Sequence, residues 1–461
     1  MKKIFREYDI RGIFQKELTS DSVKAIGVAL GEVFRQKKIK KVSVGYDARL
    51  SCKVIKEWLF SGLNRMGVEI YDIGLLPTPV GYYSVFSEVF DANIMITGSH
   101  NPKDYSGFKI TIGKESFFGT ELYKLGDRVC EILQDKMEIE DDFRASSYDV
   151  KSRYVDFFRK NFTHLKNCDI KMVADCANGA MGAVLRDVCD ALCFKNVDIL
   201  YEKPDGNFPN HHPDPTVRKN LKDLQLRLKE LGAKIGFGFD GDGDRVVVVT
   251  PKGVINCDYL AYLFALNITN PKVVGDVKCS INMYNQIDKF GTTYMAKTGH
   301  SNIKKAIQEL GANLGAELSG HLFFADRYFG FDDGLYAMIR AVELLNRGFD
   351  FDEILSSLPT LFSTDEIKIE SYDETKFRVI EELKKVLEKD GLKFQKIEKL
   401  ITIDGVRVNF KDGWALVRAS NTTPTLVTRY EGVSKDFIDR ARREFEELIK
   451  KIEDRLERER R

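Results

Sequence analysis

The sequence predicts an α/β protein in which three similar α/β domains with mixed sheets are followed by a smaller α+β domain. Three Val-rich segments support this prediction, since each begins with a basic residue, ends in an aspartate and precedes a probable helix. The aspartates are Asp47, Asp175 and Asp276. Strands that alternate with helices are typical of parallel α/β units. Beyond residue 365 several short strands are combined with two helices, which indicates a different kind of domain.

A further apolar strand follows each of these aspartates and ends in a polar loop that contains glycine. The three loops have the sequences TGSHNP, DGDGDR and ELSGH. Ligands of open α/β sheets bind outside the carboxyl ends of strands. We therefore expect three related units with loops at equivalent places, although ordinary βαβ sequence patterns can produce a similar resemblance.

The expected domains cover residues 1–150, 151–255, 256–365 and 366–461. A chain of 461 residues exceeds the size of a single core and suits about three or four domains. In the last domain we expect strands at EIKIES, KLITID, VRVNF and WALVRA. Ser434 is a candidate cap for the long charged helix that follows.

Composition argues against several classes of protein. The chain has 71 basic and 70 acidic side chains, so neither nucleic acid nor an anionic membrane is an expected partner. The first residues lack the apolar segment of a secretory signal, and no apolar run is long enough for a transmembrane helix. The eight cysteines contain no C-x-x-C pair. We expect a cytoplasmic protein with reduced thiols.

The run DGDGDR places three aspartates between two apolar strands. Asp240, Asp242 and Asp244 alternate with glycines, and alternate side chains of an extended segment point the same way. Converging carboxylates are costly unless a cation is bound, and an oxygen-only site suits Mg²⁺. Arg245 follows directly and can hold a phosphate beside the cation.

Two other interpretations of this run compete with a magnesium site. A calcium-binding EF-hand also begins D-x-D-x-D, but that motif requires Gly and Glu where this chain has Arg245 and Pro251. A polar surface turn between strands is the second, because Gly and Asp are common turn residues.

The TGSHNP loop places Ser99 at the end of the apolar strand ANIMI. A serine there can be a nucleophile, although the loop is not the G-x-S-x-G turn of hydrolases because Asn101 occupies the last position. A helix cap or a simple turn is the alternative. Downstream, Lys109 offers a cation for an anionic transition state or a group that carries a proton.

Two more polar clusters provide candidate site residues. In the third unit Glu317, Ser319 and His321 alternate in AELSGH, and His300 lies upstream in KTGHS. A single histidine is more often structural or exposed. In the last domain a turn rich in hydroxyl, amide and guanidinium groups offers the donors that a phosphate needs, with an ordinary hairpin turn as the alternative. Its candidates are Arg418, Ser420, Asn421, Thr422 and, on the next strand, Arg429.

Taken together and in this order, the motifs resemble those of the α-D-phosphohexomutase superfamily. The resemblance covers essentially the whole chain, from FREYDIRGIF through TGSHNP, DGDGDR, KTGHS and AELSGH to RASNTTP. It is strongest to the bifunctional phosphomannomutase/phosphoglucomutase group. The resemblance implies a heart-shaped arrangement of four domains around a central cleft, closed by a mobile last domain.

The resemblance also implies a reaction, the interconversion of hexose 1-phosphate and hexose 6-phosphate of mannose or glucose. Ser99 would carry the phosphoryl group and bind Mg²⁺ with the three aspartates, and hexose 1,6-bisphosphate would be the intermediate and activator. Arg11, Lys109, Arg245 and His321 would be catalytic, with Lys109 and His321 as candidates for moving the hydroxyl proton. The implied substrate-binding residues are Tyr8, Lys278, His300, Glu317, Ser319, Arg418, Ser420, Asn421, Thr422 and Arg429.

Three positions depart from the family pattern and bear on the sugar. Ala316 replaces a usual glycine, Ser106 a common asparagine, and Leu318 stands where related groups have Met or Gln. Leu318 favours mannose or glucose over glucosamine. The alternatives are a phosphoglucosamine mutase, a non-catalytic sugar-phosphate-binding relative and a phosphatase, and the retained Ser99 argues against the non-catalytic one. We expect a monomer or a weak homo-oligomer.

Overall fold

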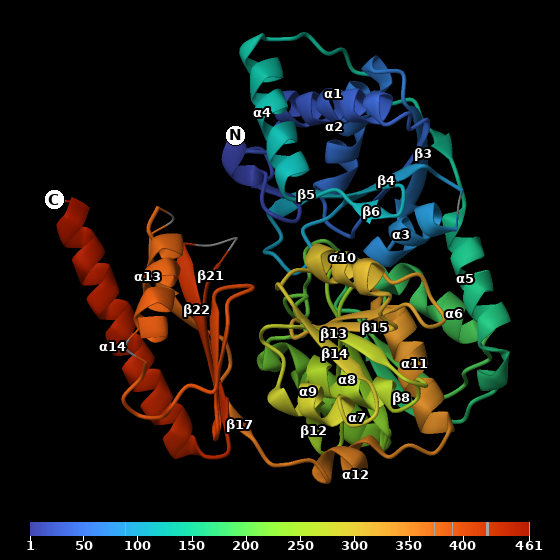
Figure 1. The fold of residues 1–461 in the computed structure, drawn as a ribbon. Helices are drawn as coiled ribbons and strands as arrows, with labels where there is room; N and C mark the ends of the chain where they lie inside the picture. The colour runs from blue at the N-terminus through green and yellow to red at the C-terminus, as the bar shows by residue number, and fades with distance from the viewer. Residues whose placement is uncertain (88, 373, 390, 421–423, 461) are drawn as a thin grey trace.

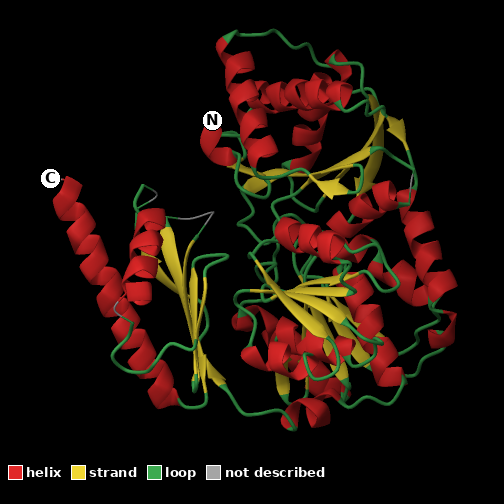
Figure 2. Cartoon of the chain, in the orientation of Figure 1, coloured by secondary structure: helices red, strands yellow, loops and turns green. Residues whose placement is uncertain are grey.

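The computed structural model describes residues 1–87, 89–372, 374–389, 391–420 and 424–460. Four separate β-sheets divide the described chain into four units. The first three units lie together, and the last, coloured orange to red, lies to one side of them (Figure 1). Figure 2 shows helices against the sheet in each unit. The predicted class, three α/β domains and a smaller α+β domain, is confirmed.

The first unit is built on a seven-stranded sheet. Its strands are β1 (Ile10–Ile13), β2 (Lys41–Tyr46), β3 (Glu69–Leu75), β4 (Ala92–Ile96), β5 (Tyr105–Ile112), β6 (Glu115–Ser116) and β7 (Ser146–Ser147). Its helices are α1 (Ser20–Gln36), α2 (Cys52–Arg65), α3 (Thr78–Phe86) and α4 (Thr120–Gln134). The strand order is β1-β5-β4-β2-β3-β7, with β6 paired to β5. Helices α1, α2 and α4 lie on one face of the sheet and α3 on the other (Figure 1).

The second and third units follow after helix α5 (Val150–Asn161). The second contains β8 (Met172–Asp175), α6 (Leu185–Ala191), β9 (Val197–Leu200), α7 (Lys222–Leu231), β10 (Ile235–Phe239), β11 (Val246–Thr250) and β12 (Gly253–Ile255). The third contains α8 (Cys257–Ala265), β13 (Lys272–Asp276), α9 (Ile281–Ile287), β14 (Thr292–Ala296), α10 (His300–Leu310), β15 (Leu314–Glu317), β16 (His321–Phe324), α11 (Gly334–Asn346) and α12 (Phe351–Ser356).

The three α/β units share one strand order. The order β5-β4-β2-β3 of the first sheet recurs as β11-β10-β8-β9 and as β16-β15-β13-β14. In each set three neighbouring strands are parallel and the fourth is antiparallel to its neighbour. The repeat predicted from the three aspartate-ending strands is therefore confirmed. Ser99, the three aspartates and Ser319 all lie in the connection between the last parallel strand and the antiparallel one.

The last unit has an antiparallel sheet and its own apolar core. It contains β17 (Phe362–Ser363), β18 (Ile367–Glu370), α13 (Lys376–Lys389), β19 (Lys399–Ile401), β20 (Val406–Phe410), β21 (Gly413–Ala419), β22 (Thr425–Gly432) and α14 (Lys435–Arg460). The order is β17-β22-β21-β20-β19, with β18 also paired to β22. Ser434 Oγ accepts a hydrogen bond from Phe437 N at 3.1 Å, as expected of a cap.

Apolar packing joins the first three units through one core, whereas the fourth unit has its own core and meets the third through a small cluster only. One continuous core runs from α3 of the first unit through the second and third sheets. Between the third and fourth units, a small cluster of Val277, Trp414 and Leu416 is buried. Within the described parts of the chain, every helix is too short or too polar to traverse a bilayer. The site described below is therefore held by three units that share a core and completed by one that does not.

Candidate active site

The repeated loops of the first and second units meet at Ser99. Its hydroxyl donates a hydrogen bond to Asp240 Oδ2 at 3.0 Å and lies 3.2 Å from His100 Nδ1. The side chain is buried, and its φ of 48° lies in the left-handed region, where residues other than glycine are uncommon. The backbone turn that creates this strain directs the hydroxyl at the acidic loop.

Arg49 holds the Ser99 loop in place. Its guanidinium is buried and donates to the carbonyl oxygens of Ser99, Asn101 and Tyr105 at 2.7–2.9 Å. Asp47 accepts from its Nε at 3.1 Å. A planar guanidinium can satisfy several acceptors at once. Arg49 was not among the residues predicted from the sequence, although it lies two residues after Asp47, one of the three repeated aspartates.

Two glycines allow the loops to approach each other closely. A Cβ on Gly98 would lie 2.5 Å from the Arg49 guanidinium, and a Cβ on Gly241 would lie 2.4 Å from the Ser99 carbonyl oxygen. Both distances are too short for any side chain. The glycines of TGSHNP and DGDGDR are thus required by the contact between the loops.

The three aspartates converge in a turn and not along an extended segment. The expected extended segment is wrong, because the residues between Phe239 and Val246 form a turn rather than a continuous strand. The turn places one oxygen from each of Asp240, Asp242 and Asp244 within 4.8 Å of the others. All three side chains are fully buried.

Lys109 is the cation of this cluster. Its ammonium group donates to Asp242 Oδ2 at 2.7 Å and also to Asp244. Burial alone would lower the pKa of Lys109, but the two carboxylates outweigh it and raise that pKa above its ordinary value. Burial and the charge of Asp242 raise the pKa of Asp240 well above its usual range. One ammonium group therefore offsets only part of the negative charge.

The cluster fits a hard cation. Its donor set consists of carboxylate oxygens with a serine hydroxyl beside them, which suits Mg²⁺. Among the described residues, Oδ1 of Asp242 and Oδ1 of Asp244 are buried without a hydrogen-bond partner. Buried acceptors of this kind are costly unless a ligand satisfies them.

His321 links the second and third units. Its Nε2 lies 2.8 Å from Arg245 Nε, and its Nδ1 lies 2.8 Å from Asp332 Oδ2. Arg245 and His321 also form a β-bridge, so their backbones are in register. Glu317 pairs with His321 across the β15–β16 hairpin and accepts a hydrogen bond from Ser319 Oγ at 2.8 Å. The polar cluster predicted from AELSGH thus surrounds one tight turn.

The amino-terminal segment closes the site from the first unit. Arg11 donates to Asn101 Oδ1 at 2.7 Å, beside the Ser99 loop. Tyr8 donates to the Thr298 carbonyl oxygen at 2.7 Å, and its ring lies edge-on to His300 with the ring centroids 6.1 Å apart. Burial, reinforced by the charge of Lys304, lowers the pKa of His300 well below its usual value.

Lys278 and Arg418 are each paired with a carboxylate on the side of the last unit. Lys278 Nζ lies 2.8 Å from Glu366, and Arg418 Nε donates to Asp404 Oδ2 at 3.0 Å. Arg429 is buried on β22 with its guanidinium 5.8 Å from the Trp414 ring. Ser420 is buried at the end of β21. Asn421 and Thr422 lie outside the described residues.

Family models match along nearly all of the chain. They are those of phosphoglucomutase/phosphomannomutase, alpha/beta/alpha domain I at residues 2–125, domain II at 152–253 and domain III at 256–362, and of the C-terminal domain at 366–448. The chain belongs to the phosphoglucomutase/phosphomannomutase family.

Relatives of similar length support this assignment. Phosphomannomutase/phosphoglucomutase from Pseudomonas syringae pv. tomato is 40% identical over 458 residues, 97% of this chain and 95% of the relative. Phosphoglucomutase from Neisseria gonorrhoeae is 39% identical over 459 residues, 97% of each chain. The crystal structure of a phosphoglucomutase/phosphomannomutase family protein from Burkholderia thailandensis superposes with a TM-score of 0.87 at 36% identity and covers 98% of both chains.

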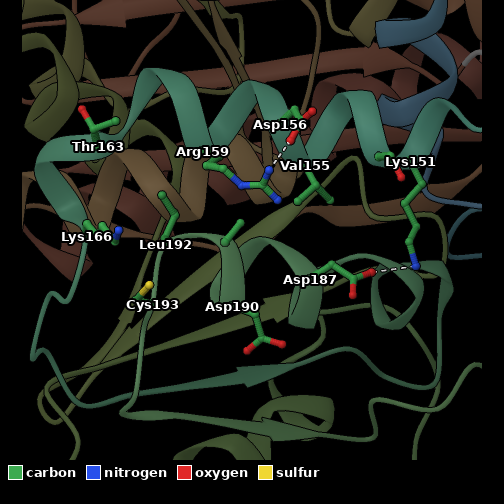
Figure 3. Close-up of a pocket in the computed structure, with 12 residues that line it drawn as sticks. Lys151, Val155, Asp156, Arg159, Thr163, Lys166, Asp187, Asp190, Leu192 and Cys193 are labelled. Carbon is green, nitrogen blue, oxygen red and sulfur yellow. Dashed lines mark ion pairs between the residues drawn. The ribbon is translucent and has the colours of Figure 1, made fainter.

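A separate surface cavity of about 850 Å³ lies outside the loop cluster of this family member. It is lined mainly by residues of α5 and α6, among them Lys151, Asp156, Arg159 and Asp187 (Figure 3). Lys151 pairs with Asp187 and Arg159 with Asp156, both at 2.6 Å. None of the predicted site residues lines this cavity, and four of its charged side chains form these two ion pairs.

Proposed function

We propose that this chain interconverts hexose 1-phosphate and hexose 6-phosphate, with mannose and glucose as its sugars. The observation that carries the proposal is the Ser99 hydroxyl, 3.0 Å from Asp240 in a buried acidic cluster with Lys109 beside it. The names of the relatives, phosphomannomutase/phosphoglucomutase and phosphoglucomutase, support the same function.

Ser99 carries the phosphoryl group in the proposed cycle. A sugar hydroxyl attacks the phosphorus, the bond from phosphorus to Ser99 Oγ breaks, and hexose 1,6-bisphosphate forms. The hydroxyl proton passes to His321 Nε2. The Ser99 oxygen released by the broken bond takes up one proton, so the step loses and gains none overall. The bisphosphate then turns around, and the reverse transfer returns its other phosphoryl group to Ser99. Added bisphosphate acts as an activator because it phosphorylates any free Ser99.

Lys109 and Arg245 stabilise the transferring group. Lys109 keeps its proton, because its pKa is raised by Asp242 and Asp244, so it serves as a fixed positive charge rather than a base. Arg245 lies next to both Asp240 and His321 and can turn its guanidinium toward the phosphoryl oxygens. Since Lys109 and Arg245 both keep their protons, His321 is the proton acceptor. Arg11 positions the Ser99 loop through its hydrogen bond to Asn101.

Asp240, Asp242, Asp244 and the Ser99 oxygen are the groups that would hold Mg²⁺. When bound, the ion neutralises charge on the phosphoryl group during transfer.

The remaining candidates would bind the substrate. Glu317 and Ser319 form a hydrogen-bonded pair suited to sugar hydroxyls. The donors for the distal phosphate are Tyr8, Lys278, His300, Arg418, Ser420, Asn421, Thr422 and Arg429. A phosphoglucosamine mutase is less supported, because the relatives at 40% and 39% identity are named phosphomannomutase/phosphoglucomutase and phosphoglucomutase. We further propose domain boundaries near residues 150, 255 and 365, a monomer or weak homo-oligomer, and a cytoplasmic location.

A coupled assay tests the proposal. Glucose 6-phosphate formation from glucose 1-phosphate is measured with Mg²⁺ and a trace of bisphosphate, followed by the mannose and glucosamine equivalents. We expect turnover of the first two and little of the third. Ser99→Ala should abolish turnover and remove the added phosphate from the intact mass. Normal rates in Ser99→Ala would contradict the mechanism, and strong glucosamine activity would contradict the sugar assignment.

A further inference from the structure

His321 has a different partner at each ring nitrogen. Arg245 Nε lies 2.8 Å from Nε2, and Asp332 Oδ2 lies 2.8 Å from Nδ1. An arginine guanidinium has only donors, so Nε2 must accept the hydrogen bond from Arg245. Nδ1 must then carry the ring proton and donate it to the Asp332 carboxylate. The two contacts together select one of the two neutral tautomers.

The plane of the His321 ring is fixed by aromatic neighbours. The His300 ring stacks against it with the centroids 5.6 Å apart, and the Phe323 ring stacks against it at 6.2 Å. The stacking is compatible with a half-turn of the ring about its Cβ–Cγ bond. That half-turn would place a carbon where each ring nitrogen now lies. The hydrogen bond to Asp332 is what distinguishes the two orientations.

Asp332 is itself held from several sides. It is fully buried, and its Oδ1 accepts a hydrogen bond from Lys304 Nζ at 3.0 Å. A β-bridge to Phe323 fixes its backbone next to the strand of His321. The Lys304 ammonium in turn lies 4.2 Å from the centre of the Tyr82 ring, on α3 of the first unit. A buried carboxylate with a partly buried cation on its other oxygen is a stable acceptor for an imidazole N–H.

We propose that Asp332 is a positioning residue for His321. It keeps the proton on Nδ1 and the lone pair on Nε2. That lone pair accepts from Arg245, and when the guanidinium turns to the phosphoryl group the lone pair faces the sugar hydroxyl instead. Lys304 supports Asp332 in this role from helix α10. The inference rests on the proposed function, in which His321 Nε2 receives the hydroxyl proton.

The tautomer can be measured without turnover. The chain has six histidines, so long-range ¹H–¹⁵N spectra of ¹⁵N-histidine-labelled protein in Mg²⁺ buffer are tractable. A His321→Gln variant assigns the His321 signals. In the wild-type protein we expect Nδ1 to be protonated and Nε2 to be unprotonated. In Asp332→Asn, whose amide can donate to Nδ1, we expect the opposite tautomer to be populated.

Kinetics with a matched control separate positioning from stability. Asp333 is the adjacent buried aspartate, but it caps α11 and accepts hydrogen bonds from Tyr154 and Tyr328 at 2.8 Å instead. Asp332→Asn should lower kcat by about 10²- to 10⁴-fold and leave KM within about threefold. Asp333→Asn should lower Tm and leave kcat within about threefold of the wild type.

The outcomes are distinct. A wild-type His321 protonated at Nε2 would overturn the inference even if Asp332→Asn failed to fold. Equal kcat losses in the two variants would also overturn it, because the effect would then be structural. A wild-type protein that shows the expected tautomer but turns over no hexose phosphate would contradict the proposed function and leave the positioning contact intact.

Discussion

Arg49 and Lys278 occupy equivalent positions in two copies of one α/β unit, but their cationic groups have different partners. Each lies two residues after an aspartate at the carboxyl end of the first parallel strand. Its backbone N–H donates to that aspartate, Asp47 at 3.0 Å and Asp276 at 2.9 Å. The guanidinium of Arg49 then bonds carbonyl oxygens of its own unit. The ammonium of Lys278 faces carboxylates, one of them Glu366 of the last unit.

This difference shows how one repeated turn acquires two roles. Carbonyl oxygens of the backbone cannot leave without unfolding the loop, so the Arg49 contacts are permanent. A carboxylate such as Glu366 can be exchanged for a phosphate, which offers the same charged oxygens. The first copy of the turn therefore stabilises the Ser99 loop, and under the proposed function the third would hold the phosphate of the substrate.

Arg49→Met should have the largest effect of the variants that probe this comparison. It leaves Asp47 without its cation and several buried carbonyl oxygens without a donor. We expect a loss of about 3 to 5 kcal/mol in the free energy of unfolding, measured with urea. We also expect kcat to fall by about 100-fold or more, because the Ser99 hydroxyl is no longer held in position. Wild-type kcat in this variant would show that the Ser99 loop does not depend on Arg49.

Lys278→Met should act on substrate binding instead. It removes a charged donor for phosphate, so we expect KM to rise by about 10- to 100-fold with a smaller loss of stability than in Arg49→Met. Steady-state kinetics and urea unfolding measure the two effects. Glu366→Gln is the matched control with the opposite expected effect. It removes the ion pair of Lys278 and leaves the ammonium free for phosphate, so KM should fall by about two- to fivefold. An unchanged KM in both variants would place Lys278 with Arg49 as a structural residue.

In the second unit the cation beside the equivalent aspartate is a histidine, which titrates near neutral pH. Ala177 stands two residues after Asp175, and His211 from another loop supplies the cation, with Nε2 3.0 Å from Asp175 Oδ2. Burial lowers the pKa of His211, but the contacts with Asp175 outweigh it, and the pKa is raised. Because the folded-state pKa is raised, protonation of the ring stabilises the fold, and this stabilisation is complete at pH values below the ordinary histidine pKa of about 6.5. This stabilisation is lost as pH rises through the folded-state pKa.

His211→Asn should therefore have a pH-dependent effect, the smallest of the three. Urea unfolding of the wild type and the variant should differ more at pH 5.5 than at pH 8.5, since Asn retains a donor but not the charge. The stability loss of Arg49→Met should be the same at both pH values, because arginine does not titrate there. An equal loss for His211→Asn at both pH values would show that its contact with Asp175 does not depend on protonation.

The sequence predicted the features that depend on local patterns. Strand-ending aspartates and glycine loops indicated the repeat, and the family motifs indicated Ser99 and the acidic cluster as site residues. The geometry of Asp240 to Asp244 was predicted wrongly, because alternation along an extended strand and convergence in a turn give the same spacing. The partners of His321 were not predicted, because Asp332 and Lys304 belong to different elements and carry no motif of their own. They meet because α10 packs against Phe323 of β16 and because Asp332 forms a β-bridge to the same residue.

The close contact between Gly241 and the Ser99 carbonyl also has a consequence for synthesis of the chain. The serine and its aspartate partner Asp240 are separated by 141 residues. At roughly 5 to 20 residues per second, a ribosome would need roughly 7 to 28 s to extend from one to the other. During that interval the first unit has Ser99 but not yet Asp240, the carboxylate that accepts its hydrogen bond. The acidic residues that complete the proposed phosphoserine site are therefore available only after the second unit has been synthesised.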